Sequence, residues 1–225
     1  MTYLLLIVTL GIAVIDWIAV AMNWRFVEYI CKPGVMLALL AWLWVTASVQ
    51  GVLFWFALGI LFSLAGDIFL MLPANLFIPG LIAFLLAHIA YIRGFNQSLP
   101  PFNPIALIPI LIVLIAFWLI YNKLSASLSE HKQNGLKIPV LIYAIVISLM
   151  LLSAVFTFLK PDWGFPATAL VTAGALLFYI SDTILAWNKF VAPVHNGRLL
   201  NISAYHLGQI LLITGAAINF LSNKL

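Results

Sequence analysis

The sequence predicts an all-α integral membrane protein, built as a bundle of eight transmembrane helices. Hydrophobic residues make up 65% of the 225-residue chain and charged residues only 7%, against roughly 45–50% and 25% in soluble domains. The mean hydropathy is +1.19. A soluble domain of this size has too much surface to bury so many apolar side chains, so the composition alone indicates a protein that lies in a membrane.

Each predicted helix is an apolar run long enough to cross a bilayer. A hydrocarbon core about 30 Å thick needs about 20 helical residues at 1.5 Å each. None of the runs has the alternating pattern of a membrane barrel strand, so we expect no strands. A single transmembrane domain, residues 1–225, is therefore predicted, with helices near residues 2–22, 33–50, 51–72, 77–94, 104–122, 138–159, 165–187 and 201–221.

The connections between these runs are short and polar. Gln50 and Gly51 alone separate the second and third runs, which predicts a tight hairpin. The longest and most charged connection joins the fifth and sixth runs. Because a proline favours the start of a helix, we expect the second helix to begin at Pro33. Three carboxylates are placed in solvated connections: Glu28, Glu130 and Asp162.

The positive charges predict the orientation of the bundle. The connections that follow odd-numbered helices carry seven Lys and Arg residues, whereas the other side, with both termini and Lys224, carries three. Since Lys and Arg stay preferentially in the cytoplasm, we expect both termini outside it, and a multi-pass inner-membrane protein if the source is bacterial. No Lys or Arg precedes the first run, which contains Asp16, so no cleavable signal peptide is expected.

The charge and cysteine content exclude some functions. The calculated pI is about 9.3, but ten Lys and Arg against six Asp and Glu is a small excess that is spread over the connections, so no nucleic-acid partner is expected. Cys31 is the single cysteine, which excludes an internal disulfide and argues against a cysteine metal cluster.

A weak internal repeat relates the two halves of the chain. The segment around Asp67 resembles the segment around Asp182, and the two aspartates lie 115 residues apart, each in the third helix of a four-helix half. A four-plus-four duplication produces such a pattern. Chance similarity between apolar helices produces it equally well.

Three carboxylates lie inside predicted helices: Asp16, Asp67 and Asp182. An intramembrane charge costs about 2.5–3.5 kcal/mol on insertion scales and therefore calls for a role. Asp67 and Asp182 each lie five residues before the same end of their predicted helices, and Tyr205 and Gln209 enter the layer from the eighth helix. This shared depth predicts a candidate site, whereas Asp16 is interpreted as a packing element.

Further polar residues are candidates for a supporting role, each with a plainer alternative. His88 and Tyr91 share a face of the fourth helix, where His88 could equally be a satisfied core imidazole. Tyr205 and Gln209 could simply bond helices together. Arg25 and Lys32 could contact a lipid phosphate, or be ordinary positive residues of the cytoplasmic side.

The motifs around these positions resemble the YhhN-like family in order along nearly the whole chain. The matching residues are Lys32-Pro33, Gly66-Asp67, Gly80-Leu81 with Phe84, His88 and Tyr91, Ser181-Asp182, and Tyr205 with Gln209. That family includes lysoplasmalogenases, membrane hydrolases that cleave the vinyl-ether bond of lysoplasmalogens to a fatty aldehyde and a glycerophospho-base. The resemblance implies an ether hydrolase with a lysophospholipid substrate and membrane lipids around it.

The predicted site residues fit that chemistry. Protonation of the outer alkene carbon gives an oxocarbenium ion that water attacks, as in glycoside hydrolysis with its two carboxyl groups. Either Asp67 or Asp182 is the expected proton donor, and the other stabilises the cation or orients water. Tyr205 and Gln209 are expected to hold water or the alkoxide, and His88 to replenish the proton. Ser181 and Tyr91 support the site, and Arg25 or Lys32 neutralises the phosphate. No metal or cofactor is required, and the oligomeric state is not predicted.

Two other functions remain open at this stage. A small proton-coupled transporter or lipid-binding membrane protein could use the aspartates to carry protons, because duplicated halves with intramembrane acids occur in that class. A metal-dependent membrane lipid amidase could use Asp67, Asp182, His88 and His206 as ligands, although two histidines at unequal depth make a poor set.

Overall fold

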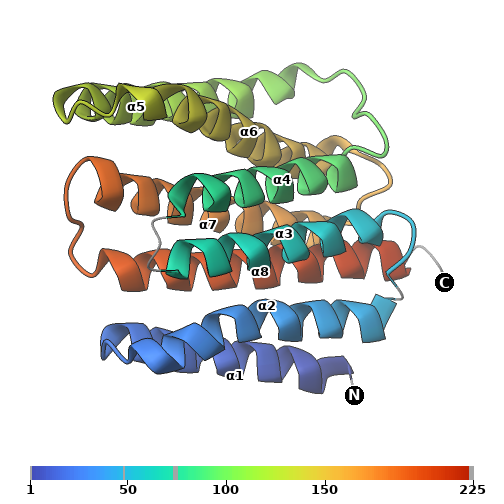
Figure 1. Cartoon of the computed structure of the whole chain (residues 1–225). Helices are drawn as coiled ribbons and strands as arrows, with labels where there is room; N and C mark the ends of the chain where they lie inside the picture. Colours follow the sequence, from blue (N-terminus) through green and yellow to red (C-terminus); the bar gives the residue numbers. More distant parts are fainter. Residues whose placement is uncertain (1, 48, 73–75, 223–225) are drawn as a thin grey trace.

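The computed structural model describes residues 2–47, 49–72 and 76–222, and in these ranges it contains helices and no strands (Figure 1). Eight helices of the described chain are long and apolar enough to cross a membrane, which confirms the predicted fold class. They are α1 (Thr2–Ala21), α2 (Arg25–Ala47), α3 (Leu53–Met71), α4 (Phe77–Phe95), α5 (Leu107–Glu130), α6 (Lys137–Val155), α7 (Phe165–Phe190) and α8 (Gly197–Ser222). Three short 3-10 helices complete the described elements: η1 (Pro104–Ala106), η2 (Asn134–Leu136) and η3 (Phe156–Leu159).

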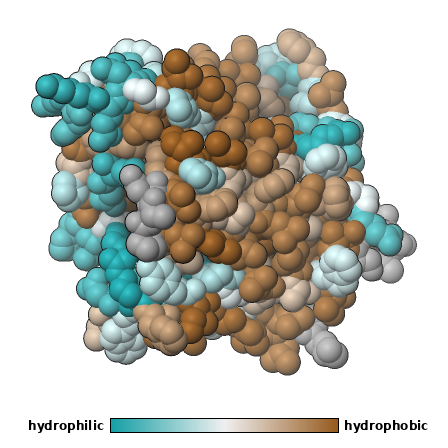
Figure 2. Space-filling model, viewed as in Figure 1, coloured by the Kyte–Doolittle hydropathy of each residue, from teal (hydrophilic) through white to brown (hydrophobic). Residues whose placement is uncertain are grey.

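The helices stack in pairs, with α3, α4, α7 and α8 in the middle of the bundle. Helices α1 and α2 lie on one side of these four, and α5 and α6 lie on the other (Figure 1). On the face seen in Figure 2, apolar residues form a broad middle zone and hydrophilic residues gather toward the two ends. Such a surface suits a bundle whose middle lies in hydrocarbon.

One end of the bundle carries the functional features described below. It is the end at which α1, α3, α5 and α7 finish and α2, α4, α6 and α8 begin (Figure 1), and we call it the site end. Helix α1 begins and α8 finishes at the opposite end. The side of the membrane that each end faces stays a prediction, and the predicted connection at Pro73 and the charge of Lys224 lie outside the described residues.

Glycines allow the central helices to pack in close contact. The Tyr91 ring of α4 lies directly over Gly59 of α3, where an added Cβ would be 2.0 Å from a ring carbon. In α7, a Cβ on Gly174 would be 2.5 Å from the backbone nitrogen of Leu212 in α8. Without a strong hydrophobic driving force between helices in lipid, such close packing is a main source of helix association. The suggested four-plus-four duplication stays a prediction.

The start of the second helix differs from the expectation. Helix α2 begins at Arg25, so that Pro33 and Lys32 lie inside it and Glu28 lies in its first turn. The predicted start at Pro33 and the solvated connection for Glu28 were therefore wrong. A proline removes one helix hydrogen bond, but membrane helices tolerate the loss because neighbouring groups and local adjustments satisfy the freed carbonyl.

Other helices continue beyond their apolar runs at the site end. Helix α5 extends to Glu130, so Glu130 is helical and not part of a connection, and α7 extends to Phe190 while α8 already begins at Gly197. The apolar pattern marks only the part of each helix that lies in hydrocarbon. Residues such as Lys, Glu and Ser then continue the helix into the interfacial region at little cost. The expected hairpin at Gln50 and Gly51 is present as a turn, with Gly51 at a φ of 59°.

At the end opposite the site, a buried lysine caps the C-terminus of α4. The ammonium of Lys160 donates to the carbonyl oxygen of Phe95 at 2.7 Å and to the side-chain oxygen of Asn96 at 3.2 Å. A cation at the C-terminus of a helix satisfies its last carbonyl groups and complements its dipole. Burial lowers the pKa of this lysine, against the opposing effect of nearby Asp162.

We expect Gly174→Ala to destabilise the protein. The new methyl group would lie 2.5 Å from the Leu212 nitrogen and 2.6 Å from the Gly208 oxygen, so α7 and α8 must separate, at about 1–3 kcal/mol. Gly11→Ala is the matched control, because nothing lies within 4 Å of its added carbon and helical alanine is favoured by roughly 0.5–1 kcal/mol. Thermal unfolding in detergent measures both, and equal transition temperatures for the two variants would contradict the close packing.

Candidate active site

A polar cavity opens at the site end, between α2, α3, α7 and α8. It encloses about 860 Å³ of space, including its open side. Residues from α1 and α4 complete its wall. Its lining is charged to a degree that is unusual in a membrane bundle, with six acidic or basic side chains: Arg25, Glu28, Lys32, Asp67, Asp182 and Arg198.

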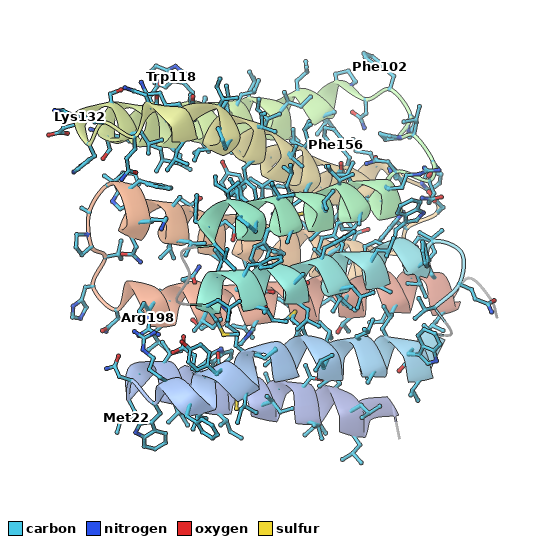
Figure 3. The ribbon with its side chains drawn as sticks, viewed as in Figure 1. Met22, Phe102, Trp118, Lys132, Phe156 and Arg198 are labelled. Atoms are coloured by element: carbon cyan, nitrogen blue, oxygen red, sulfur yellow. The ribbon has the colours of Figure 1, made fainter. Side chains whose placement is uncertain are left out.

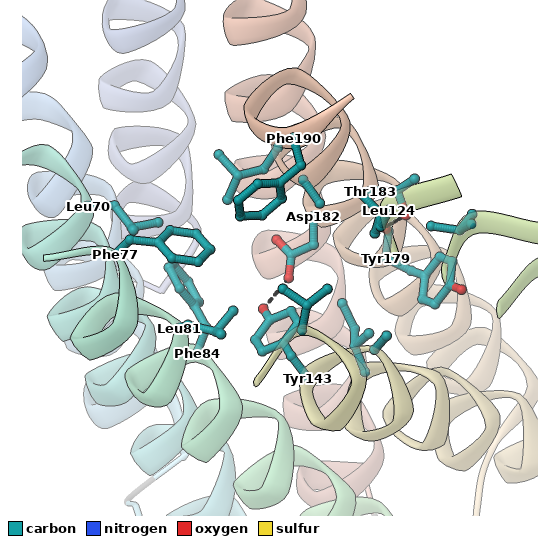
Figure 4. A pocket seen from close by; sticks show the side chains of 16 residues that line it. Leu70, Phe77, Leu81, Phe84, Leu124, Tyr143, Tyr179, Asp182, Thr183 and Phe190 are labelled. Carbon is teal, nitrogen blue, oxygen red and sulfur yellow. Dashed lines mark hydrogen bonds between the residues drawn. The ribbon is translucent and has the colours of Figure 1, made fainter. Parts of the chain in front are cut away.

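An apolar cavity of about 670 Å³ adjoins the polar one (Figure 4). It lies between α4, α5, α6 and α7 and is lined mostly by aliphatic and aromatic side chains. The two cavities share part of their walls, namely Leu70, Phe84, Asp182 and Leu185. Asp182 is thus the one ionisable residue of the described chain that borders both cavities.

Asp67 is held by two donors from neighbouring helices. The Tyr205 hydroxyl donates to its Oδ2 at 2.7 Å, and the Lys32 ammonium lies 3.3 Å from its Oδ1. The Asp67 side chain is only 1% exposed, and that of Lys32 is 14% exposed. A buried carboxylate needs such partners, and the ion pair joins α2, α3 and α8 at the floor of the polar cavity.

Asp182 has a different set of partners. The Tyr143 hydroxyl of α6 donates a short hydrogen bond to its Oδ2 (Figure 4). Nε2 of His88 lies 3.0 Å from the same hydroxyl and 3.5 Å from the same carboxylate oxygen. The Oδ1 of Asp182 accepts no hydrogen bond from the described residues and is not among their fully buried atoms. One oxygen of Asp182 is therefore open to a ligand.

The two aspartates border one polar cavity, although they are 115 residues apart in the sequence. Asp67 lies four residues before the end of α3 at Met71, and Asp182 lies eight before the end of α7 at Phe190. The unequal spacing differs from the expectation because α7 continues farther into the interface. No hydrogen bond joins the two carboxyl groups within the described chain, and each has its own donors.

Two of the expected supporting residues lie one helical turn deeper. The Tyr91 hydroxyl donates to the side-chain oxygen of Gln209 at 2.7 Å, and the Gln209 amide donates to Ser63 at 2.8 Å. None of these three residues borders either cavity. They bond α3, α4 and α8 together beneath Asp67 and Tyr205, which makes this cluster a support for the site.

Ser181 fixes α7 to α8 beside the polar cavity. Its hydroxyl donates to the carbonyl oxygen of Asn201 at 3.0 Å, and the Asn201 amide donates to the Ser181 hydroxyl at 2.9 Å and to its carbonyl at 2.8 Å. Both residues line the cavity. This reciprocal bonding holds the α7 segment that carries Asp182.

The rim of the polar cavity is a charged cluster. Nη2 of Arg198, at the start of α8, donates to both carboxylate oxygens of Glu28 at 2.7 and 2.9 Å. Nη1 of Arg25 lies 4.0 Å from Glu28, and the Arg25 side chain is 65% exposed. Figure 3 places Arg198 at the site end, between the beginnings of α8 and α2. Glu28 is thus a partner of two arginines and only 13% exposed.

Sequence reasoning missed Tyr143, Glu28 and Arg198. A single tyrosine in an apolar helix gives no signal, because most such residues are ordinary packing or interfacial groups. Glu28 and Arg198 were placed in connections, where charged residues are expected. The one available signal was a pair of opposite charges, with Glu28 just before the second apolar run and Arg198 just before the eighth. Both residues line the polar cavity.

Two further buried groups lie outside the site. Asp16 is fully buried, but neither of its oxygens has a hydrogen-bond partner in the described residues, so the hydrogen bond expected of a packing element is missing there. His206 accepts from the Trp17 indole at 3.2 Å through Nδ1. In the described chain, no group of three or more His, Cys, Asp and Glu side chains is placed to hold a metal, so the ligand set suggested for an amidase is not assembled.

The protein is thus a helical membrane bundle in which a charged cavity adjoins an apolar one. The model of the YhhN family matches residues 27–216, and the chain belongs to this family. It is 31% identical to lysoplasmalogenase TMEM86B of Mus musculus, over 90% of this chain and 80% of the relative. It is 32% identical to human lysoplasmalogenase TMEM86A, over 70% and 63%. A lysoplasmalogenase of Mycobacterium tuberculosis is 28% identical, over 61% and 50%. No solved structure matches the chain.

We expect Lys32→Met to destabilise the protein strongly. The substitution leaves the buried Asp67 carboxylate without its cation, which typically costs about 3–5 kcal/mol. The double variant Lys32→Met with Asp67→Asn removes both charges and should recover most of the loss. Thermal unfolding in detergent compares the two variants with the wild type, and a single Lys32→Met variant as stable as the wild type would show that the ion pair does not hold these helices.

Proposed function

We propose that this protein is a membrane hydrolase that cleaves the vinyl-ether bond of lysoplasmalogens to a fatty aldehyde and a glycerophospho-base. The observation that carries the proposal is the position of Asp182, which borders both the polar and the apolar cavity. A lysoplasmalogen changes from polar to apolar at its vinyl ether. Membership of a family with relatives named lysoplasmalogenase supports the same substrate.

The proposed substrate can occupy the two cavities in only one orientation, because one cavity is apolar and the other is charged. Its alkenyl chain enters the apolar cavity between α4, α5, α6 and α7, and its glycerophospho-base occupies the polar cavity at the site end. This placement brings the vinyl ether to Asp182, with Asp67 on the polar side. With the termini proposed to be non-cytoplasmic, the polar cavity opens toward the cytoplasmic leaflet.

We assign the proton donor to Asp182 and the fixed negative charge to Asp67. Asp182 has an oxygen open to the cavity, and a donor must reach the reacting carbon. Asp67 has an ammonium and a hydroxyl directed at its two oxygens, and such donors suit a carboxylate that remains ionised. A fixed carboxylate close to a developing cation is an effective electrostatic stabiliser.

The reaction consumes one water and returns the enzyme to its starting state. The Asp182 carboxyl proton is transferred to the outer alkene carbon, and the alkene electron pair forms the new C–H bond. This leaves an oxocarbenium ion on the inner carbon and the ether oxygen. Water adds to that carbon while its proton goes to Asp182. The hemiacetal then collapses: its hydroxyl proton is transferred to the glycerol oxygen, the bond between that oxygen and the carbon breaks, and the products are the aldehyde and the glycerol alcohol.

Other residues position these groups. Tyr143 donates to one Asp182 oxygen, and His88 contacts that hydroxyl and lies within 3.5 Å of the carboxylate. Tyr205 holds Asp67. Gln209 contacts neither aspartate, so in this proposal it supports the site through Tyr91 and Ser63 and does not hold the water.

We expect Asp182→Asn and Asp67→Asn each to lower aldehyde release by on the order of 10²–10⁴-fold, the usual contribution of a general acid. Asp67→Asn also leaves the Lys32 ammonium without its partner, so its activity is compared per folded protein, below its own unfolding temperature. Asp162→Asn is the matched control, since Asp162 is exposed and bonded to Ser98 at the far end of the bundle. The measurement is release of free aldehyde from a lysoplasmalogen by the detergent-purified protein.

Near-wild-type turnover by either site variant would contradict the two-aspartate mechanism. A wild-type protein that releases no aldehyde, but moves protons or lysolipid into vesicles, would instead support the alternative of a proton-coupled transporter. Loss of wild-type activity with a chelator would support a metal-dependent hydrolase.

We expect Ala144→Phe to shorten the chain that the enzyme accepts. Ala144 lines the apolar cavity, and a phenyl group there occupies space needed by a long alkenyl chain. The value of kcat/KM should fall roughly tenfold or more for a long-chain substrate and change little for a short-chain analogue. Ala126→Phe, on an exposed position of α5, is the matched control, and equal losses with both chain lengths would contradict the assignment of this cavity.

A further inference from the structure

The charged rim of the polar cavity has no role in the proton transfers described above. It consists of Arg25 and Glu28 in the first turn of α2 and Arg198 in the first turn of α8. These three residues come from two helices that both begin at the site end. The first backbone N–H groups of a helix have no partner within it, so helix beginnings also favour an anion.

Lys32 is not available at this rim. Its ammonium is paired with Asp67 at 3.3 Å, and its side chain is 14% exposed. Of the two residues expected to neutralise a phosphate, Lys32 is therefore already paired, and only Arg25 is free to do so. Lys32 serves the aspartate, and the exposed guanidinium groups of the rim remain for a ligand.

We infer that Arg198 and Arg25 form the subsite for the phosphodiester of the substrate, with Glu28 as the positioning residue that holds Arg198. The inference rests on the proposed function, because it assigns the head-group contacts of that same substrate. Arginine is suited to this task, since its planar fork of donors matches the oxygens of a phosphate.

The geometry leaves donors of Arg198 free while fixing the side chain. Only Nη2, through its bonds to both oxygens of Glu28, and Nη1, through a 3.3 Å bond to Asn23, are engaged within the described chain. A guanidinium has five N–H donors, so a phosphate can bind without displacing Glu28. Arg25 is loosely placed, at 4.0 Å from Glu28 and 65% exposed, and is free to close on the second side of the phosphate.

The test compares two substrates with the same vinyl-ether chain, alkenylglycerophosphocholine and alkenylglycerol, of which only the first carries a phosphate. Arg198→Met should raise KM for the phosphocholine substrate by on the order of 10–100-fold, the effect of one or two lost charge-assisted hydrogen bonds. KM for alkenylglycerol should stay within about twofold. Arg198→Lys should recover part of the loss, because it restores the charge without the fork.

The positioning role of Glu28 has its own readout. Glu28→Gln should raise KM for the phosphocholine substrate and leave kcat and the alkenylglycerol reaction unchanged, since Glu28 acts only through Arg198. Arg93→Met is the matched control, because Arg93 lies in the last turn of α4 at the opposite end, and it should alter neither substrate. Turnover of alkenylglycerol also reports that each variant is folded.

The outcomes separate this inference from the proposed function. If the wild type cleaves both substrates but Arg198→Met raises KM equally for both, or for neither, the subsite is wrong and the hydrolase remains. If the wild type cleaves neither, the proposed function itself fails. Inhibition of the wild type by inorganic phosphate, at concentrations where glycerophosphocholine has no effect, would indicate a site for free phosphate and overturn the head-group assignment.

Discussion

The buried ion pair between Lys32 and Asp67 is the interaction on which the site end depends. An isolated carboxylate in a membrane bundle is expensive, and so is an isolated ammonium. Each charge is tolerated because the other is 3.3 Å away and the Tyr205 hydroxyl binds the second carboxylate oxygen. The ion pair fixes α2 against α3, and the Tyr205 hydrogen bond joins α8 to α3. The ion pair also engages the Lys32 ammonium, which is therefore not free at the rim of the polar cavity.

The contrast between the two aspartates follows from what packs around them. Asp67 is enclosed by donors and nearly free of exposure, whereas Asp182 has donors on one oxygen and a cavity beside the other. Two like groups with different surroundings can take different roles in one reaction. Tyr143 is central to this difference, because its hydroxyl donates to one Asp182 oxygen and the other oxygen accepts no hydrogen bond from the described residues.

Close helix packing and open cavities are complementary features of this bundle. Gly59, Gly66 and Gly174 let α3 approach α4 and α7 approach α8 until side chain or backbone of one helix fills the space over a glycine of the other. The two helices of each pair, α3 with α4 and α7 with α8, therefore lie in close contact. Bulky residues such as Leu70 of α3 and Phe84 of α4 form part of the common wall of the two cavities, one polar and one apolar.

The sequence alone determined the membrane class and the eight helices, because hydrocarbon imposes length and apolarity on every span. It placed Asp67 and Asp182 at equal distances from their helix ends, whereas they lie four and eight residues before the ends of α3 and α7. It misjudged the helix ends near Pro33 and Glu130. The apolar pattern stops at the edge of the bilayer, whereas the helix continues beyond that edge. Only the tertiary structure decided which polar groups meet: Tyr143 with Asp182, or Glu28 with Arg198. Such pairs depend on how helices far apart in the chain are rotated against one another, and a single sequence carries no signal for that rotation.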